Sequence, residues 1–239
     1  MQYCDVSLPS PAENLACDEA LLDFCEAGYA SDLLRFWESP KHFVVLGYAN
    51  KSSTEVDQAT CCDFGIPLLR RCSGGGTVLQ GPGCLNYSLI LGTNAESPLK
   101  SIPGTNQFIL TKHQAALSKL LTQTVQIQGQ TDLSLDQLKF SGNAQRRKKR
   151  SLLYHGTFLL GLDFTLMGKI LPLPSKQPDY RANRSHSDFL INLELEREVL
   201  KATLRECWQA KEPLTELPLE RIEALAREKY ETEEWNLRF

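Results

Sequence analysis

The chain lacks an apolar run long enough to cross a membrane. None of its 239 residues belongs to a stretch that approaches the ~20 apolar residues of a bilayer-spanning helix. The first residues, Met1 to Asp5, have neither the charged start nor the apolar core of a secretory signal peptide. We therefore expect a cytoplasmic protein with no membrane partner.

Cysteine spacings typical of metal or redox sites are also missing. Among the eight cysteines no two are separated by two residues, and no histidine follows at zinc-finger distance. Because disulfides are disfavoured in the cytoplasm, we expect most of these thiols to be small buried apolar side chains. Cys72 and Cys84 stand apart, since they flank a segment rich in glycine.

A strong excess of positive charge is absent as well. The 26 Lys and Arg residues stand against 29 Asp and Glu residues, which gives a formal net charge of −3. This balance argues against a nucleic-acid partner. The length and the 42% hydrophobic content are sufficient for one substantial core, so we expect a single domain over residues 1–239.

Hydrophobic periodicity predicts a mixed α/β fold of the α+β type. Alternating segments that end near Gly, Pro, Ser or Asn favour strands at 33–37, 42–48, 66–71, 85–91 and 125–129. Helical spacing is found at 11–27, 54–64, 105–122, 194–209 and 219–229. The helices interleave irregularly with the strands, which disfavours a Rossmann sheet.

Two further segments have distinct patterns. Residues 137–145 and 151–162 are expected to pair as a hairpin whose turn is the basic run Arg146 to Arg150. That run is typical of a solvated turn, although a nucleic-acid signal or a surface that steers an acidic partner remains open. Residues 170–187 are rich in Pro and polar side chains and resemble a linker, but one too short to separate two domains.

The most informative segment is Arg70-Arg71-Cys72-Ser73-Gly74-Gly75-Gly76-Thr77, called the glycine loop here. It follows an apolar strand-like run, Ile66 to Leu69. Glycine allows positive φ and close approach of a ligand, so successive N–H groups can converge on a carboxylate or a phosphate. An isolated glycine triplet is otherwise typical of a flexible turn.

Other segments occur with the glycine loop in a fixed order. They are Asn14-Leu15-Ala16-Cys17-Asp18-Glu19, Leu85-Asn86-Tyr87-Ser88, Lys139-Phe140-Ser141-Gly142-Asn143-Ala144-Gln145 and His155-Gly156-Thr157. Together they resemble the lipoate-protein ligase A family, within the biotin/lipoate ligase and octanoyltransferase superfamily. The resemblance extends over nearly the whole chain, to Glu234-Trp235-Asn236.

The resemblance implies a biotin/lipoate ligase-like catalytic domain with a mixed twisted β-sheet and flanking helices. It also implies an ATP-dependent ligase that uses ATP and Mg²⁺ to convert lipoate or octanoate to an acyl-adenylate. The acyl group then passes to a lysine of a lipoyl-domain acceptor protein. Ligases of this type often carry an accessory C-terminal domain, for which 239 residues leave no room, so a separate small accessory subunit is expected.

The resemblance assigns roles residue by residue. Lys139 is the catalytic residue, because its match in the family neutralises charge on the carbonyl and phosphate oxygens. The lipoate-binding residues are Arg70, Ser73, Gly74, Gly75, Gly76, His155, Gly156 and Thr157. The nucleotide-binding residues are Arg71, Thr77, Asn86, Asp132, Lys139, Ser141, Gly142, Asn143 and Ala144. Asp132 is also a candidate magnesium ligand.

Two alternatives stay open. The first is a cysteine-dependent octanoyltransferase or lipoyl amidotransferase, which forms a thioester acyl-enzyme and needs no ATP. Residues 161–200 contain no cysteine, but Cys72, Cys84 and Cys207 remain candidates. The second is a non-catalytic lipoate-binding module. One departure from the family is Gln80-Gly81, where many members have His-Asp.

Overall fold

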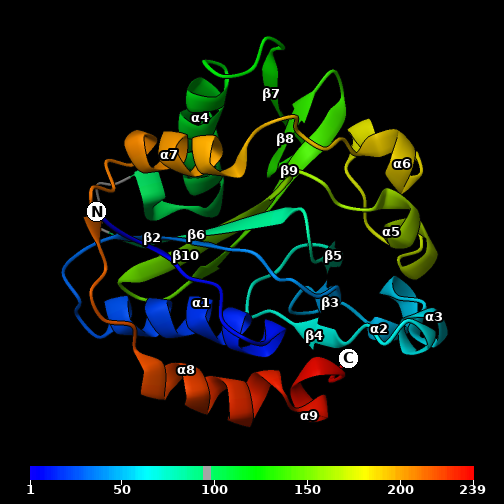
Figure 1. Cartoon of the computed structure of the whole chain (residues 1–239), viewed down its shortest axis with the longest axis horizontal. Coiled ribbons are helices and arrows are strands. Elements are labelled where there is room, and N and C mark those ends of the chain that lie inside the picture. Colours follow the sequence, from blue (N-terminus) through cyan, green and yellow to red (C-terminus); the bar gives the residue numbers. More distant parts are fainter. Residues whose placement is uncertain (94–97) are drawn as a thin grey trace.

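The large sheet separates two layers of helices (Figure 1). The computed structural model describes residues 1–93 and 98–239. Within them the large sheet has eight strands in the order β11-β1-β2-β6-β10-β9-β8-β7. These strands are β1 (Gln2–Asp5), β2 (Leu33–Trp37), β6 (Cys84–Gly92), β7 (Val125–Gln128), β8 (Asp132–Leu135), β9 (Leu138–Arg147), β10 (Ser151–Leu159) and β11 (Glu212–Pro213). The mixed α/β fold predicted from the sequence is confirmed.

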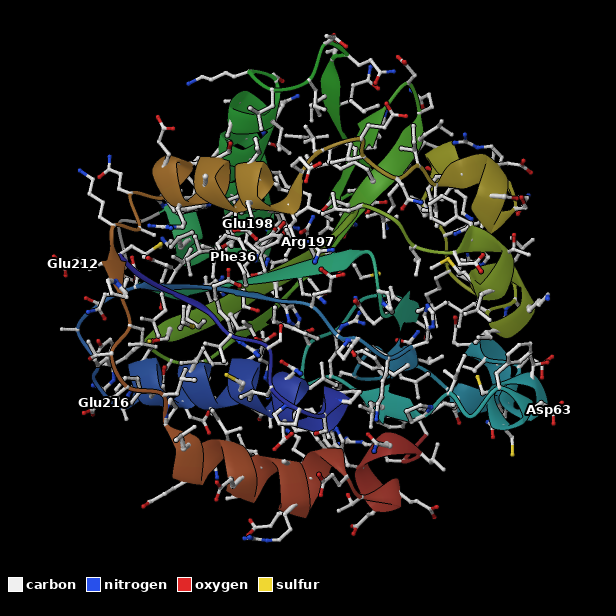
Figure 2. All side chains as sticks on the ribbon, viewed as in Figure 1. Phe36, Asp63, Arg197, Glu198, Glu212 and Glu216 are labelled. Carbon is white, nitrogen blue, oxygen red and sulfur yellow. The ribbon has the colours of Figure 1, made fainter. Side chains whose placement is uncertain are left out.

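Helices cover both faces of this sheet (Figure 1). On one face α1 (Pro11–Glu26) packs with α8 (Leu219–Leu225), and on the other α4 (Ile102–Leu117) packs with α7 (Arg197–Cys207). Strand residues alternate between two cores, so that Leu33 and Leu153 join the first while Leu34, Phe36 and Leu152 join the second. Phe36 lies among interior side chains, whereas Asp63 and Glu216 lie at the periphery (Figure 2).

A small second sheet forms one wall of the site described below. It has the order β4-β3-β5, from β3 (Phe43–Leu46), β4 (Leu68–Arg70) and β5 (Val78–Gln80). The glycine loop therefore connects two strands that lie on either side of β3. This arrangement fixes both ends of the loop while its middle remains exposed.

Helix α1 begins as its sequence predicts. Ser10 caps its first turn, with Pro11 in the first turn and Glu13 closing a capping box, in which the Ser10 hydroxyl accepts from Glu13 N and Glu13 accepts from Ser10 N. The 54–64 prediction is instead divided between α2 (Ser52–Glu55) and α3 (Gln58–Asp63), because Asp57 caps a new helix. Residues 219–229 likewise end as α8 and continue as a π-helical turn, η3 (Ala226–Tyr230).

The predicted hairpin is confirmed as β9 and β10, with the basic run at its tip. The tip is not free, because backbone N–H groups of Lys149, Arg150 and Ser151 donate to the Glu26 carboxylate at the end of α1. Lys148 also pairs with Asp23. Within residues 1–93 and 98–239, helices are too short or too polar to span a bilayer.

The interpretation of residues 170–187 as a linker is wrong. This stretch holds the end of α5 (Phe164–Ile170), the 3₁₀ turn η2 (Asp179–Arg181) and the start of α6 (His186–Phe189). Its polar side chains make internal contacts, as when Arg184 donates to the carbonyls of Tyr180 and Arg181. Residues 174–181, called the covering segment here, form part of a cavity wall.

Candidate functional site

A cavity of about 880 Å³ lies where the two sheets approach each other. Val45 and Val78 line it from the small sheet, and Tyr87 and Lys139 line it from the large sheet. The glycine loop, residues 128–132 and the covering segment complete the wall. A cavity of this size is typical of a small-molecule site.

Lys139 and Asp132 form an ion pair in the cavity wall. The ammonium of Lys139 lies 2.9 Å from Oδ1 of Asp132, with 25% of the lysine side chain exposed. Tyr180 donates to the other oxygen, Oδ2, at 2.8 Å. Burial and the Asp132 charge both raise the pKa of Tyr180, so its hydroxyl stays protonated as the donor. The carboxylate thus fixes Lys139 and the covering segment at one point.

Gly142 leaves the space that the Lys139 side chain occupies. A Cβ at position 142 would lie 2.7 Å from Nζ and 2.8 Å from Cε of Lys139. Gly142 pairs directly with Asp132 across β8 and β9. A side chain at position 142 would therefore force the head of Lys139, the flexible end of its side chain, to move.

The glycine loop folds around the guanidinium of Arg71. Nη2 of Arg71 donates to the carbonyls of Gly74 at 2.6 Å and Gly76 at 2.8 Å, and Nε donates to Ser73 Oγ at 3.1 Å. Burial lowers the pKa of Arg71 to about 10, so the group is still charged at neutral pH. Within the described residues Arg71 has no ion pair with a carboxylate. It is a buried cation at the cavity wall whose hydrogen-bond partners are backbone carbonyls and the Ser73 hydroxyl, none of which carries a charge.

A chain of hydrogen bonds continues from Ser73 into the protein. Nε2 of His155 lies 2.6 Å from Ser73 Oγ, and Nδ1 lies 3.3 Å from Oδ2 of Asp18. The other Asp18 oxygen pairs with Arg35 at 2.6 Å. Although burial opposes it, Arg35 keeps the pKa of Asp18 below its usual value. Both ring nitrogens of His155 are therefore engaged, Nδ1 by the Asp18 carboxylate, which can only accept, and Nε2 by the Ser73 hydroxyl.

Most of the residues expected at the site meet at this cavity. Those in its wall are Arg71, Gly75, Gly76, Thr77, Asn86, Asp132, Lys139, Gly142, Asn143, Ala144, His155, Gly156 and Thr157. Ser73 supports the wall through Arg71 and His155, and Gly74 supports it through Arg71. Ser141 is fully buried in the strand behind it.

Arg70 does not lie where a lipoate contact requires it. Its side chain is fully buried and donates to the carbonyls of Gly47, Tyr48, Asn50 and Asn236. Arg71 directly follows β4 and continues its pairing with β3, so successive side chains point to opposite faces, with Arg71 toward the cavity and Arg70 away from it. Arg70 therefore ties β4 to the C-terminal segment.

Gln80, at the end of β5, is part of a closed polar network. It donates to Thr157 Oγ1 at 2.7 Å and accepts from the Asn86 amide at 3.0 Å. Thr157 in turn donates to Asn86 Oδ1 at 2.6 Å. The expected nucleotide contact Asn86 therefore has its amide engaged by protein groups, and it acts in this arrangement as a rigid part of the wall.

Sequence reasoning missed the covering segment and Asp18. The only signal for the former was Lys176, Tyr180 and Arg181 placed among prolines, which a composition-based interpretation assigns to a linker. Asp18 lies on a helix, and its connection to Ser73 is set by tertiary packing rather than by spacing. Neither position can be assigned without knowing which elements meet.

The wall of the cavity contains no cysteine among the described residues. Cys72 and Cys84 are buried in the cores, and burial raises the pKa of each thiol to about 12. Cys207 lies on α7, where its thiol faces the carbonyl of Lys112 at 3.6 Å and burial raises its pKa. None of these thiols is placed or ionised as a nucleophile for this cavity.

The residues do not form a metal centre of their own. In the part of the chain that is described, no group of three or more His, Cys, Asp or Glu is arranged to hold a metal ion. Asp132, the candidate magnesium ligand, has one oxygen on Lys139 and the other on Tyr180. The donor set therefore does not fit a magnesium site held by protein ligands.

Residues 10–208 match the family described as the lipoyl protein ligase A/B catalytic domain. The chain belongs to this family. A relative along its whole length is the octanoyltransferase LipM of Carboxydothermus hydrogenoformans, 28% identical over 96% of each chain. Lipoate–protein ligase 1 of Staphylococcus aureus is 29% identical over 96% of this chain and 71% of the relative.

Solved structures of lipoyl protein ligase A/B members have the same architecture. The bi-partite lipoate protein ligase of Thermoplasma acidophilum superposes with a TM-score of 0.81 at 25% identity, covering 99% of this chain and 95% of that one. A lipoate-protein ligase A bound with ATP has a TM-score of 0.73 at 25% identity over 99% of each chain. The protein is thus an enzyme of the lipoate ligase and octanoyltransferase family.

Proposed function

We propose that this protein is a lipoate-protein ligase that activates lipoate or octanoate with ATP and transfers the acyl group to a lysine of a lipoyl domain. The observation that carries the proposal is a cavity with Lys139 and Arg71 in its wall and, among the described residues, no cysteine. An acyl-adenylate route needs cations that hold phosphate and carboxylate oxygens. A thioester route needs a thiolate at the same place.

The residues present account for the charge changes of both steps. In the first step a carboxylate oxygen of lipoate attacks the α-phosphorus of ATP and pyrophosphate leaves with the electron pair of the broken bond. In the second step the acceptor amine attacks the carbonyl and AMP leaves. Lys139 is suited to stabilise the negative charge in both transition states, because Asp132 holds its ammonium in place.

Arg71 and the glycine loop are suited to the carboxylate or α-phosphate. The guanidinium is held by Ser73 and by two loop carbonyls, so it is preorganised before substrate arrives. An anion bound there would act as the counter-ion of Arg71. Trp37, Val45 and Tyr87 supply apolar surface for the acyl chain in the same cavity.

An octanoyltransferase remains the second candidate, because the LipM relatives match this chain over their whole length. We propose further that residues 1–239 form a single catalytic domain and that the ligase acts with a small accessory subunit. The support is a relative called lipoate-protein ligase A subunit 1, from Thermoplasma acidophilum, 26% identical over 94% of this chain. The acceptor is proposed from the solved bi-partite ligase, which is described with its E2 lipoyl domain.

The deciding experiment incubates the protein with a lipoyl-domain acceptor and either lipoate with ATP and Mg²⁺ or an octanoyl-carrier donor. Mass spectrometry of the acceptor and lipoate-dependent pyrophosphate release are measured, with and without a candidate small subunit. Lys139→Ala should abolish transfer from pre-made lipoyl-adenylate, whereas Lys169→Ala on α5 serves as the matched control. Acyl transfer from the carrier without ATP would overturn the ligase proposal in favour of the transferase.

A further inference from the structure

Arg181 is a second buried cation in the cavity wall. It ends the turn η2, it lines the cavity, and only 5% of the residue is exposed. Within residues 1–93 and 98–239 it forms no ion pair with a carboxylate. A buried guanidinium without a counter-ion is costly, and a bound anion would remove that cost.

Three contacts fix the guanidinium before any ligand binds. Its central carbon lies 4.7 Å from the centre of the Phe189 ring. Nε donates to the carbonyl of Arg184 at 3.2 Å, and Nη2 donates to Nδ1 of His186 at 3.3 Å. Nη1 has no hydrogen-bond acceptor among the described residues, so it remains available to a ligand.

His186 acts as an acceptor only when it is neutral. Burial, and then the charge of Arg181, lower the pKa of His186 from its usual value. Its Nε2–H donates to the carbonyl of Leu171 at 3.1 Å, which leaves Nδ1 to accept from Arg181. The histidine thus connects the end of α5 to the guanidinium and limits its movement.

Arg181 also directly follows the residue that contacts the Lys139–Asp132 ion pair. The preceding residue, Tyr180, donates to Asp132, the partner of Lys139, and its ring packs 5.1 Å from Phe189. The guanidinium of Arg181 and the ring of Tyr180 therefore pack against the same ring, that of Phe189. Lys176 of the same covering segment adds a further cation to this end of the wall.

We infer that Arg181 binds a phosphate group of the activating nucleotide and stabilises the departing pyrophosphate. This inference rests on the proposed ligase function. As the lipoate oxygen bonds to the α-phosphorus, the bond from that phosphorus to the bridging oxygen breaks and its electron pair stays on pyrophosphate. Arg181 remains protonated, and the N–H groups of Nη1 donate hydrogen bonds to the phosphate oxygens that carry this charge.

The test compares Arg181→Gln with Arg184→Gln, in the full-length protein. Arg184 also stacks on Phe189, at 5.1 Å, but lies outside the cavity wall, so its variant reports on damage to the covering segment. Titration calorimetry measures the affinity for a non-hydrolysable ATP analogue, for inorganic pyrophosphate and for lipoate. Pyrophosphate release and transfer from pre-made lipoyl-adenylate are measured in parallel.

Loss of one hydrogen bond to a charged group should weaken binding of the analogue and pyrophosphate by about 10- to 100-fold in Arg181→Gln. Transfer from lipoyl-adenylate, which lacks the two outer phosphates, should fall much less. Arg181→Lys should recover part of the affinity, because it restores the charge without the planar fork. A larger effect on lipoate than on pyrophosphate affinity, or equal losses in Arg181→Gln and Arg184→Gln, would overturn the inference.

The same measurements separate this inference from the proposed function. A wild-type protein that releases lipoate-dependent pyrophosphate together with an unaffected Arg181→Gln variant refutes only the role of Arg181. A wild-type protein that binds neither the ATP analogue nor pyrophosphate, with its candidate small subunit present, refutes both.

Discussion

Gly142→Ala tests whether the position of the Lys139 ammonium, rather than its charge alone, limits acyl transfer. The new Cβ would lie 2.7 Å from Nζ and 2.8 Å from Cε of Lys139. Ordinary contacts of this kind are about 3.5–4 Å, so the lysine head must move by roughly 1 Å. Because one oxygen of Asp132 is 2.9 Å from Nζ, that movement also disturbs the ion pair.

The expected effect of Gly142→Ala on the rate of transfer is much larger than its expected effect on the free energy of unfolding. A displacement of about 1 Å in a positioned catalytic group can lower the rate about 100-fold. The ion pair is partly exposed and is worth only about 0–1 kcal/mol to stability. Replacing glycine by alanine inside a strand favours the folded state by roughly 0.5–1 kcal/mol. We therefore expect a large loss of rate with a free energy of unfolding that changes by less than about 1 kcal/mol.

The assay follows transfer from pre-made lipoyl-adenylate to an acceptor domain, so that ATP binding does not enter the result. Urea denaturation of the same samples gives the free energy of unfolding. Gly168→Ala is the matched control, because a Cβ at this helical position meets no atom within 4 Å. A rate within threefold of wild type for a folded Gly142→Ala variant would refute the positional argument.

Three further predictions concern other parts of the chain. Cys72→Ser and Cys84→Ser should keep most of the acyl-transfer activity measured by mass spectrometry, and a folded but inactive variant with a trapped thioester in wild type would contradict this. Burial lowers the pKa of His113 to about 3, so stability should be full above pH 6.5 and fall below it, by about 2 kcal/mol at pH 5. Urea denaturation should show a smaller fall in His113→Gln, which keeps an acceptor for Trp208. Gly75→Val should abolish lipoate binding by calorimetry, because Gly75 has a φ of 90° and a Cβ there would lie 2.8 Å from Arg71; unchanged affinity would count against the loop.

The sequence predicted elements well where local chemistry decides them. The start of α1 follows from Ser10, Pro11 and Glu13, and the β9–β10 hairpin follows from two apolar segments around a basic turn. Strand β8 was missed because it has only four residues, Asp132–Leu135, whose polar and apolar residues alternate over too short a stretch to identify a strand. Its existence depends on neighbours on both sides, β7 and β9, which a local pattern does not contain.

The candidate site shows the same contrast between what local sequence decides and what tertiary packing decides. Lys139 and Asp132 were proposed from motifs and do meet, while Arg70 and Arg71 could not be separated by residue type. Strand direction separates them, because β4 is fixed against β3 by register and only one of two successive side chains can face the cavity. Arg181 was missed because its placement depends on His186 and Phe189, which contact it from the next helix, α6.

Sequence similarity does not separate a ligase from an octanoyltransferase, whereas the side chains of the cavity give a reason to favour the ligase. Relatives named octanoyltransferase and lipoate ligase match this fold at nearly equal identity, 28% and 29%. A transferase that takes its acyl group from a thioester must also stabilise a carbonyl oxyanion, but it has no departing pyrophosphate to neutralise. Arg71 and Arg181 are both buried in one wall without a carboxylate partner among the described residues. Since burial of such groups is costly unless an anion joins them, their placement in the cavity wall favours a substrate with phosphate as well as carboxylate oxygens.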